Sequence, residues 1–324
     1  MEVNCEGCAG CCLDWYSLFE ASADLEGTSG RPDQDQRRTT VDAGDGRPPL
    51  DDDSNVVPLT REEIRGFLEA EMAAALTPRF WHARDDAEGV DVDGYTVAAV
   101  GGRPVFFVGL RKPPKPVAPF GREEPTWLPA CVFLDPPVLQ CRIYDDDLFP
   151  AECGAYPAHN LVLGRETECE RVESAGGGER LLETAVPEDL EGPLLGTQAL
   201  GAKLFAHPRP DDLEGIVGRA AEGELTPADR AKCLAVAASS SPGTVAVSDH
   251  HYERYLARAL ETTVDCRSDG RDGADRDASW VGPAIREWHR RKRDANGAVP
   301  DPDVATTVED DRGAPGTPGW DGLE

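Results

Sequence analysis

Cysteines dominate the residues of this chain that could carry out chemistry. Four of them fall within one short stretch, in which a C-x2-C-x2-C spacing is followed at once by another cysteine: Cys5, Cys8, Cys11 and Cys12. Thiolates bind zinc and iron tightly, and such short spacings let one loop supply several ligands to one centre. Gly7 and Gly10 allow the sharp turns that aim the sulfurs inward. Because adjacent side chains cannot easily point the same way, Cys11 and Cys12 are expected to serve different metals or different corners of one cluster.

A second group of cysteines follows later in the chain: Cys131, Cys141, Cys153 and Cys169. Cys131 and Cys141 each come just before apolar residues, which suits a loop that delivers a ligand while its neighbours enter the core. Together the eight thiols would support two four-ligand sites, or one iron–sulfur cluster with thiols to spare. The alternative is that some are ordinary buried cysteines. That interpretation is preferred for Cys233, in an Ala/Leu-rich helix, and Cys266 is expected to be a free thiol.

Other residue types add little to this prediction. His159 lies six residues after Cys153 and could replace a thiol as ligand, but a surface or hydrogen-bonded histidine is the more common case. The run Asp145-Asp146-Asp147 is interpreted as a solvated turn rather than a cation site. No P-loop and no G-x-S-x-G motif occurs, and Gly176 to Gly178 lack a strand-to-helix context. The sequence therefore assigns metal ligands, and it assigns neither catalytic nor cofactor-binding residues.

The composition is strongly acidic. The chain has 324 residues, a net charge of -28 and 40% apolar residues, and its few basic residues are mostly arginine. Heavy Asp and Glu with few lysines is typical of a protein from a salt-loving organism, where molar salt screens self-repulsion. No basic face is evident, so nucleic acid is not expected as a partner. The run Arg290 to Arg293 could contact an acidic protein, although such runs are more often solvated helix ends.

The compartment is predicted from the start of the chain and from its hydropathy. Met1 to Asn4 begin the chain without an apolar run, so no signal peptide is expected. No stretch reaches the roughly 18 apolar residues that a membrane helix needs, so no membrane partner is expected. We therefore predict a cytoplasmic protein, in which thiols stay reduced and ten cysteines favour metal over disulfides.

Local patterns predict the main elements. Thr60 as N-cap with Glu63 three residues on predicts a helix that runs to about Leu76, with Pro78 ending it. Two strands over 95–100 and 105–110, joined at Gly101-Gly102, predict a hairpin. Residues 112–125 are predicted to be a proline-rich loop. Helical patterns are assigned to 194–205, 211–221, 227–238 and 249–260, with a further short helix over 280–293.

These elements predict an α+β fold. Residues 1–173 are expected to form a small Cys-rich metal-binding module with a hairpin and helices, interrupted by an acidic disordered insertion over 22–55. A mostly helical region over 186–264 and a mostly disordered acidic tail over 265–324 would follow. Leu13, Trp15, Tyr16, Leu18 and Phe19 are expected to pack beside the cysteine loop and shield it from water.

Several short motifs resemble one known family. Besides the first cysteine group, they are the Val57 to Glu63 helix start, Cys131-x-Phe-Leu-Asp, Cys141-x-Ile-Tyr, Pro150-x2-Cys153 and Tyr156-Pro157. Together they resemble the CxxCxxCC cysteine-cluster family of zinc- or iron-chelating proteins, to which the flagellin lysine N-methylases are similar. The resemblance covers residues 1–173. It departs where Phe149 precedes Pro150 and Gly154 follows Cys153, since the family commonly has arginines there.

The predicted function is therefore metal binding, with zinc or an iron–sulfur cluster as the cofactor. The predicted ligands are Cys5, Cys8, Cys11, Cys12, Cys131, Cys141, Cys153 and Cys169. The leading hypothesis is a structural metal, because four thiolates close a zinc site. The alternative, which the resemblance implies, is an iron–sulfur-dependent enzyme similar to protein lysine N-methyltransferases. A thiol redox sensor is a third possibility. The metal ion is the expected partner, with another protein as a further candidate.

Overall fold

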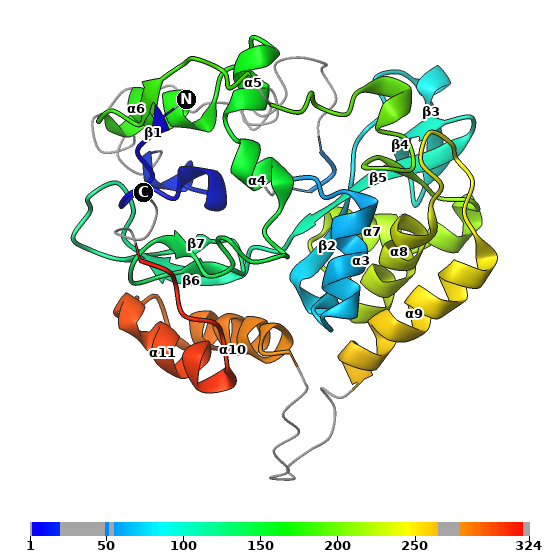
Figure 1. The fold of residues 1–324 in the computed structure, drawn as a ribbon. Coiled ribbons are helices and arrows are strands. Elements are labelled where there is room, and N and C mark those ends of the chain that lie inside the picture. The colour runs from blue at the N-terminus through cyan, green and yellow to red at the C-terminus, as the bar shows by residue number, and fades with distance from the viewer. Residues whose placement is uncertain (1, 20–48, 52–54, 189, 265–278, 320–324) are drawn as a thin grey trace. The chain divides into compact units, whose positions relative to one another are not determined.

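The computed structural model describes residues 2–19, 49–51, 55–188, 190–264 and 279–319 (Figure 1). The protein has an α+β fold whose paired strands are antiparallel, as predicted. Its residues divide into two compact units. Unit 1 lies within Met1–Arg31, Arg111–Pro193 and Pro283–Glu324, and unit 2 lies within Pro32–Leu110 and Leu194–Gly282. Among the described residues, no helix has the length and apolar character needed to cross a membrane.

Unit 2 is built on a five-stranded sheet. Its strands are β2 (Leu76–Phe80), β3 (Gly89–Val92), β4 (Tyr95–Val100), β5 (Arg103–Leu110) and β11 (Phe205–Ala206). The order is β11-β5-β4-β3, and β2 also pairs with β5. The predicted hairpin between β4 and β5 is confirmed. Gly101 and Gly102 have φ values of 58° and 71°, which a tight turn with positive φ at both central residues requires.

Helices pack against this sheet. They are α3 (Arg61–Glu69), α7 (Ile216–Ala221), α8 (Pro227–Ser239) and α9 (Asp249–Val264), with short 3-10 turns η2 (Ala73–Ala75), η3 (Asp86–Glu88), η4 (Gly196–Gln198) and η5 (Pro210–Leu213). The predicted capping box of α3 is confirmed, since Thr60 and Glu63 satisfy each other's backbone N–H groups. Phe80, Phe106 and Phe205 are fully buried and pack ring to ring in the core. The predicted helices at 227–238 and 249–260 are also confirmed.

Unit 1 consists of three two-stranded sheets and short helices. The strand pairs are β1 (Glu2–Val3) with β10 (Leu181–Glu183), β6 (Pro114–Val117) with β7 (Thr126–Pro129), and β8 (Leu134–Asp135) with β9 (Gln140–Cys141). The helices are α4 (Ala151–Ala155), α5 (Ala158–Val162), α6 (Glu168–Gly176), α10 (Val281–Asp294) and α11 (Ala305–Val308), with 3-10 turns η1 (Gly10–Cys12), η7 (Pro302–Val304) and η8 (Asp310–Arg312). Trp127 of β7 meets Trp288 of α10 edge to face at 6.4 Å, so the C-terminal helices pack on the β6–β7 pair (Figure 1).

Some sequence predictions were wrong because pairing between distant segments overrides local pattern. The helix predicted up to Leu76 ends at Glu69, and Pro78 lies within β2, where it faces Val108 of β5. Residues 194–205 contain only η4 and the start of β11 rather than a helix. The helix expected over 211–221 is split between η5 and α7. The proline-rich loop contains β6.

The predicted boundaries also differ from the compact units. Residues 56–110 of the expected N-terminal module belong to unit 2, and the C-terminal segment belongs to unit 1. Within the expected insertion over 22–55, the structure describes only residues 49–51 and 55. Leu50 is buried and its N–H donates to the Phe80 carbonyl at 3.0 Å. In the expected tail, α10 and α11 are ordered helices, and residues 265–278, with Cys266, lie outside the described part.

Candidate functional site

The first cysteine group forms a tight loop that ends in η1. The Cys8 N–H donates to the Cys5 carbonyl at 3.0 Å, and the Cys12 N–H donates to the Ala9 carbonyl at 2.8 Å. Gly10 lets this loop approach α6, because a Cβ at position 10 would lie 2.7 Å from Cγ2 of Val172. Such a contact is too short for carbon atoms, so the close packing of loop against helix depends on glycine here.

Aromatic side chains cover this loop, as predicted. Trp15 is only 2% exposed, and its Nε1 donates to Oε1 of the buried Glu168 at 2.7 Å. The Trp15 ring stacks on Tyr16 at 4.4 Å and meets Phe19 and Phe120 edge to face at 5.5 and 5.8 Å. The Phe120 N–H also donates to the Gly7 carbonyl, at 2.8 Å. These rings therefore form one aromatic cluster beside the cysteine loop.

Backbone pairing brings part of the second cysteine group to the first. The Cys131 N–H donates to the Cys12 carbonyl at 2.8 Å, next to an antiparallel bridge between Leu13 and Ala130. The β8–β9 pair then places Cys141 opposite Leu134. The thiols of Cys12, Cys131 and Cys141 are therefore carried on neighbouring backbone segments, although they are far apart in the sequence.

Cys169 reaches the same region from α6. This helix begins with a capping box, in which Thr167 accepts from the Glu170 N–H and the Glu170 carboxylate accepts from the Thr167 N–H. Its first turn carries Cys169, and Val172 of the same helix packs on Gly10. Cys11 lies close enough to six other cysteines to influence the pKa values of their thiols: Cys5, Cys8, Cys12, Cys131, Cys141 and Cys169. We call the following residues the thiol cluster: Cys5, Cys8, Cys11, Cys12, Cys131, Cys141 and Cys169.

Burial and mutual repulsion keep most of these thiols protonated. Burial raises the pKa of Cys5 and of Cys141 to about 12 in each case, and neighbouring thiols raise it further. Burial is also the largest cause of the raised pKa values of Cys8, Cys131 and Cys169. Several thiolates packed together away from water are too unfavourable to form without a compensating cation.

Cys11 and Cys12 behave differently because they form a pair. Their sulfur atoms lie 3.9 Å apart. A hydrogen bond from the Cys12 thiol lowers the pKa of Cys11, and the same bond, together with burial, raises the pKa of Cys12 well above its usual value. Cys11 is therefore the more acidic thiol of this pair.

Basic side chains surround the cluster. Arg180 lowers the pKa of Cys5 and Cys8, which opposes the effect of burial. Lys112 contributes a lowering of the pKa at Cys11 and Cys131, and Lys115 contributes the same at Cys131 and Cys141. In a chain with a net charge of -28, these three cations offset part of the effect that burial has on the pKa values of the thiols.

The remaining predicted residues lie as follows. Cys153 is partly buried on α4. His159 lies between two acceptors, with Nδ1 3.2 Å from Oε1 of Glu152 and Nε2 2.9 Å from the Glu191 carbonyl oxygen, so it is a hydrogen-bonded histidine. Asp145 to Asp147 are exposed, and Cys233 is fully buried in α8, both as predicted. Within the described ranges, no three His, Cys, Asp or Glu side chains are already arranged to hold one metal ion.

Sequence reasoning missed a buried ionic network beside the thiol cluster. Lys115 is completely buried, and its Nζ donates to the carbonyls of Val132 and Leu134 at 2.8 and 2.6 Å. The same Nζ pairs with Oε1 of Glu309 at 2.6 Å, and this carboxylate is also completely buried. Trp288 Nε1 donates to the same oxygen at 2.8 Å. Lys115 therefore ties the backbone after Cys131 to the C-terminal segment.

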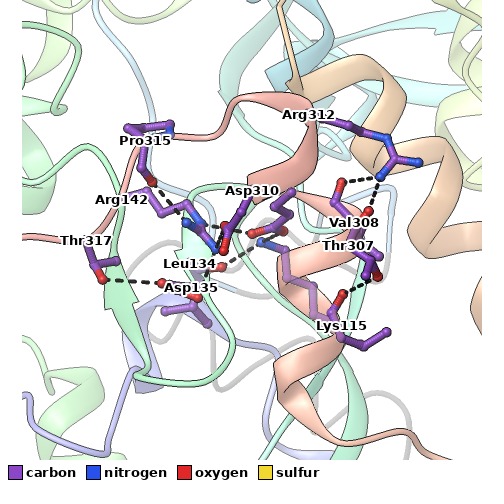
Figure 2. Close-up of polar contacts among 12 residues, drawn as sticks. Lys115, Leu134, Asp135, Arg142, Thr307, Val308, Asp310, Arg312, Pro315 and Thr317 are labelled. Carbon is purple, nitrogen blue, oxygen red and sulfur yellow. Dashed lines mark hydrogen bonds and ion pairs between the residues drawn. The ribbon is translucent and has the colours of Figure 1, made fainter.

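Arg142, the residue after Cys141, completes the network. Its Nε pairs with Oε2 of Glu309 at 2.9 Å, and its Nη2 pairs with Asp135 at 3.0 Å and Asp310 at 2.9 Å. Its Nη1 donates to the Pro315 carbonyl at 2.9 Å. Figure 2 shows these contacts converging from the β8–β9 segment and the segment after α11. We call Lys115, Asp135, Arg142, Glu309 and Asp310 the Lys115 network. The sequence signal was slight: a lysine between two prolines in a chain with few lysines.

The fold and the site define an α+β protein that gathers buried thiols in one of its two units. The chain belongs to a family of unknown function, DUF7531, whose model matches residues 1–321. No curated protein and no solved structure matches the chain. The resemblance to the CxxCxxCC family stays a prediction.

Proposed function

We propose that this protein binds a metal through the thiol cluster, as zinc or as an iron–sulfur cluster. The observation that carries the proposal is the placement of Cys12, Cys131 and Cys141 on neighbouring backbone segments, with Cys11 and Cys169 close enough to influence their pKa values or to be influenced by them. A soft thiolate donor set of this kind suits zinc and iron. Bound metal would supply the positive charge that lets the buried thiols ionise.

The donor set fits such a metal chemically, and binding would require the loops to move. The described side chains do not already form a set that holds one ion, so the sulfurs of the cysteine loop, the β8–β9 segment and α6 would draw together when an ion binds. Metal binding would then be coupled to the folding of unit 1, because the same loops form its core. The role proposed for the metal is structural.

The test is metal and acid-labile sulfide analysis of the protein purified without oxygen in molar KCl. Cys131→Ala is the informative variant, and Cys233→Ala is its matched control, since both thiols are buried and only Cys131 belongs to the cluster. We expect Cys131→Ala to lose metal and Cys233→Ala to keep the wild-type content. Zinc without sulfide would assign a structural site. Iron with sulfide and broad absorption at roughly 400 nm would assign a thiolate-held cluster.

Two results would refute the proposal. One is wild-type protein that contains no zinc and no iron and takes up neither under reducing conditions. The other is Cys131→Ala protein that folds and keeps the full metal content, because the ion would then be held elsewhere.

A further inference from the structure

The Lys115 network connects the C-terminal segment to the loop that carries Cys131 and Cys141. Lys115 holds the carbonyls of Val132 and Leu134, which are the first and third residues after Cys131. Arg142 directly follows Cys141. Both cations meet on one carboxylate, that of Glu309, at 2.6 and 2.9 Å. The Glu309 side chain therefore contacts one end of the 131–142 loop directly, at Arg142, and the other end through Lys115.

The buried charges of Lys115, Arg142 and Glu309 are all paired within the Lys115 network. Glu309 Oε1 accepts from Lys115 and from Trp288, and its Oε2 accepts from Arg142. The side chains of Lys115 and Glu309 are 0% exposed and that of Arg142 is 2% exposed. Buried charges this well paired tolerate little displacement, because any movement leaves a charge without its partner. Such an arrangement holds geometry more than it adds net stability.

We propose that Glu309 is a positioning residue for Cys131 and Cys141, which it holds in place through Lys115 and Arg142. The assignment of these two thiols as metal ligands rests on the proposed function. The proposal that the C-terminal segment fixes their loop does not depend on that assignment, and it can be tested in metal-free protein. In this view the segment after α10 is part of the site, although it carries none of the thiols of the cluster.

The further contacts of the segment support this role. Thr317 Oγ1 donates to Oδ2 of Asp135 at 3.3 Å, and the Gly319 N–H donates to Oε1 of Gln140 at 3.0 Å. Asp135 and Gln140 are a cross-strand pair of the β8–β9 hairpin, so the C-terminal segment binds a side chain on each strand of the hairpin. Figure 2 shows the contact between Thr317 and Asp135.

The experiment measures how fast each thiol is alkylated in the full-length, metal-free protein, resolved by mass spectrometry. Glu309→Gln keeps the shape of the side chain and removes its charge. Glu287→Gln is the matched control, because Glu287 pairs with two arginines of α10 at the surface, outside the network. We expect Glu309→Gln to speed alkylation of Cys131 and Cys141 by about tenfold or more, since opening of their loop becomes easier. Cys8 and Cys233 should keep their wild-type rates.

The test depends on whether alkylation becomes faster at Cys131 and Cys141 alone or at all the buried thiols. A general loss of stability would speed all the buried thiols together, including Cys233 of unit 2, and would overturn the proposal. Unchanged rates at Cys131 and Cys141 would overturn it as well. If Glu309→Gln does not fold, Asp310→Asn applies the same test, because Asp310 is 46% exposed and pairs with the same arginine. In this variant too, alkylation should become faster at Cys131 and Cys141 only, by a smaller factor than in Glu309→Gln. Absence of metal in the wild type would refute the proposed function and leave this result standing.

Discussion

Replacing Lys115 with methionine should destabilise unit 1 and leave unit 2 unchanged. Methionine has a similar length and is apolar, so it fills the space of the lysine stem without its charge. Glu309 would then remain fully buried with Arg142 as its one cationic partner, and the carbonyls of Val132 and Leu134 would lose a shared donor.

The size of the effect follows from these contacts. Removing one partner of a buried ion pair costs about 3–5 kcal/mol. Because Arg142 and Trp288 still bind Glu309, we expect the lower end, about 3 kcal/mol. That is a large part of the roughly 5–15 kcal/mol by which a domain is stable, and it corresponds to about a hundredfold easier opening.

Hydrogen exchange resolved by mass spectrometry can measure this change locally. Backbone amides in β6, β7 and β8 should exchange about a hundredfold faster in Lys115→Met than in the wild type. Lys292→Met is the control, since Lys292 is an exposed lysine of α10, and surface substitutions change stability by only about 0.5 kcal/mol.

The reasoning would be refuted by exchange in β6 to β8 that stays within about threefold of the wild type. It would also fail if the strands of unit 2 changed as much as those of unit 1. A double variant with Glu309→Gln adds a second check. The double variant should lose less free energy of unfolding than the sum of the losses in the two single variants, because the two residues share one interaction.

Three further outcomes are expected. In metal-free protein, the alkylation rate of Cys5 should still rise about tenfold per pH unit near pH 10, because its pKa is raised to about 12 and only the thiolate reacts; a rate that levels off near pH 9, as for free cysteine, would contradict this. Gly201→Ala should lower the thermal midpoint far more than Gly223→Ala. Both glycines have positive φ, but a Cβ at 201 would lie 2.2 Å from the Ser241 carbonyl oxygen, whereas one at 223 meets nothing within 4 Å; equal losses would show that only backbone strain matters. Asp229 has its pKa lowered to about 2 by hydrogen bonds from Arg219 and Thr226, which outweigh its burial. A lowered folded-state pKa adds stability above the unfolded pKa and loses it as the pH falls through the folded one. Urea unfolding should therefore show about 1–2 kcal/mol lost between about pH 4 and pH 2 in the wild type, relative to Asp229→Asn. Parallel curves for the two proteins would refute that assignment.

Local signals predicted much of unit 2. The capping box at Thr60 and Glu63 and the two glycines between β4 and β5 are encoded within a few residues, so the sequence shows them directly. Pro78 misled the prediction, because its place in β2 depends on pairing with Val108 about thirty residues later. Strand pairing at that distance leaves no periodic pattern to detect.

In the candidate site too, the sequence showed what is encoded locally and did not show contacts between distant segments. Cysteine spacing and order named Cys12, Cys131 and Cys141, which the structure carries on neighbouring backbone segments. That these and the other named cysteines, including Cys153 on α4, are metal ligands stays a prediction. The Lys115 network was missed because its members come from segments up to 195 positions apart (310 minus 115). Nothing local distinguishes Glu309 from the many other acidic residues of this chain; its burial alone does so.

The three-segment construction of unit 1 has a consequence for biosynthesis. Arg142 and Glu309 are 167 residues apart in sequence, so at a translation rate of about 5–20 residues per second the ribosome needs about 10–30 s to make the second after the first. During that interval Cys131 and Cys141 have left the ribosome without the carboxylate that anchors their loop. The loop that carries Cys131 and Cys141 therefore stays without this anchor until Glu309 has been made and has left the ribosome.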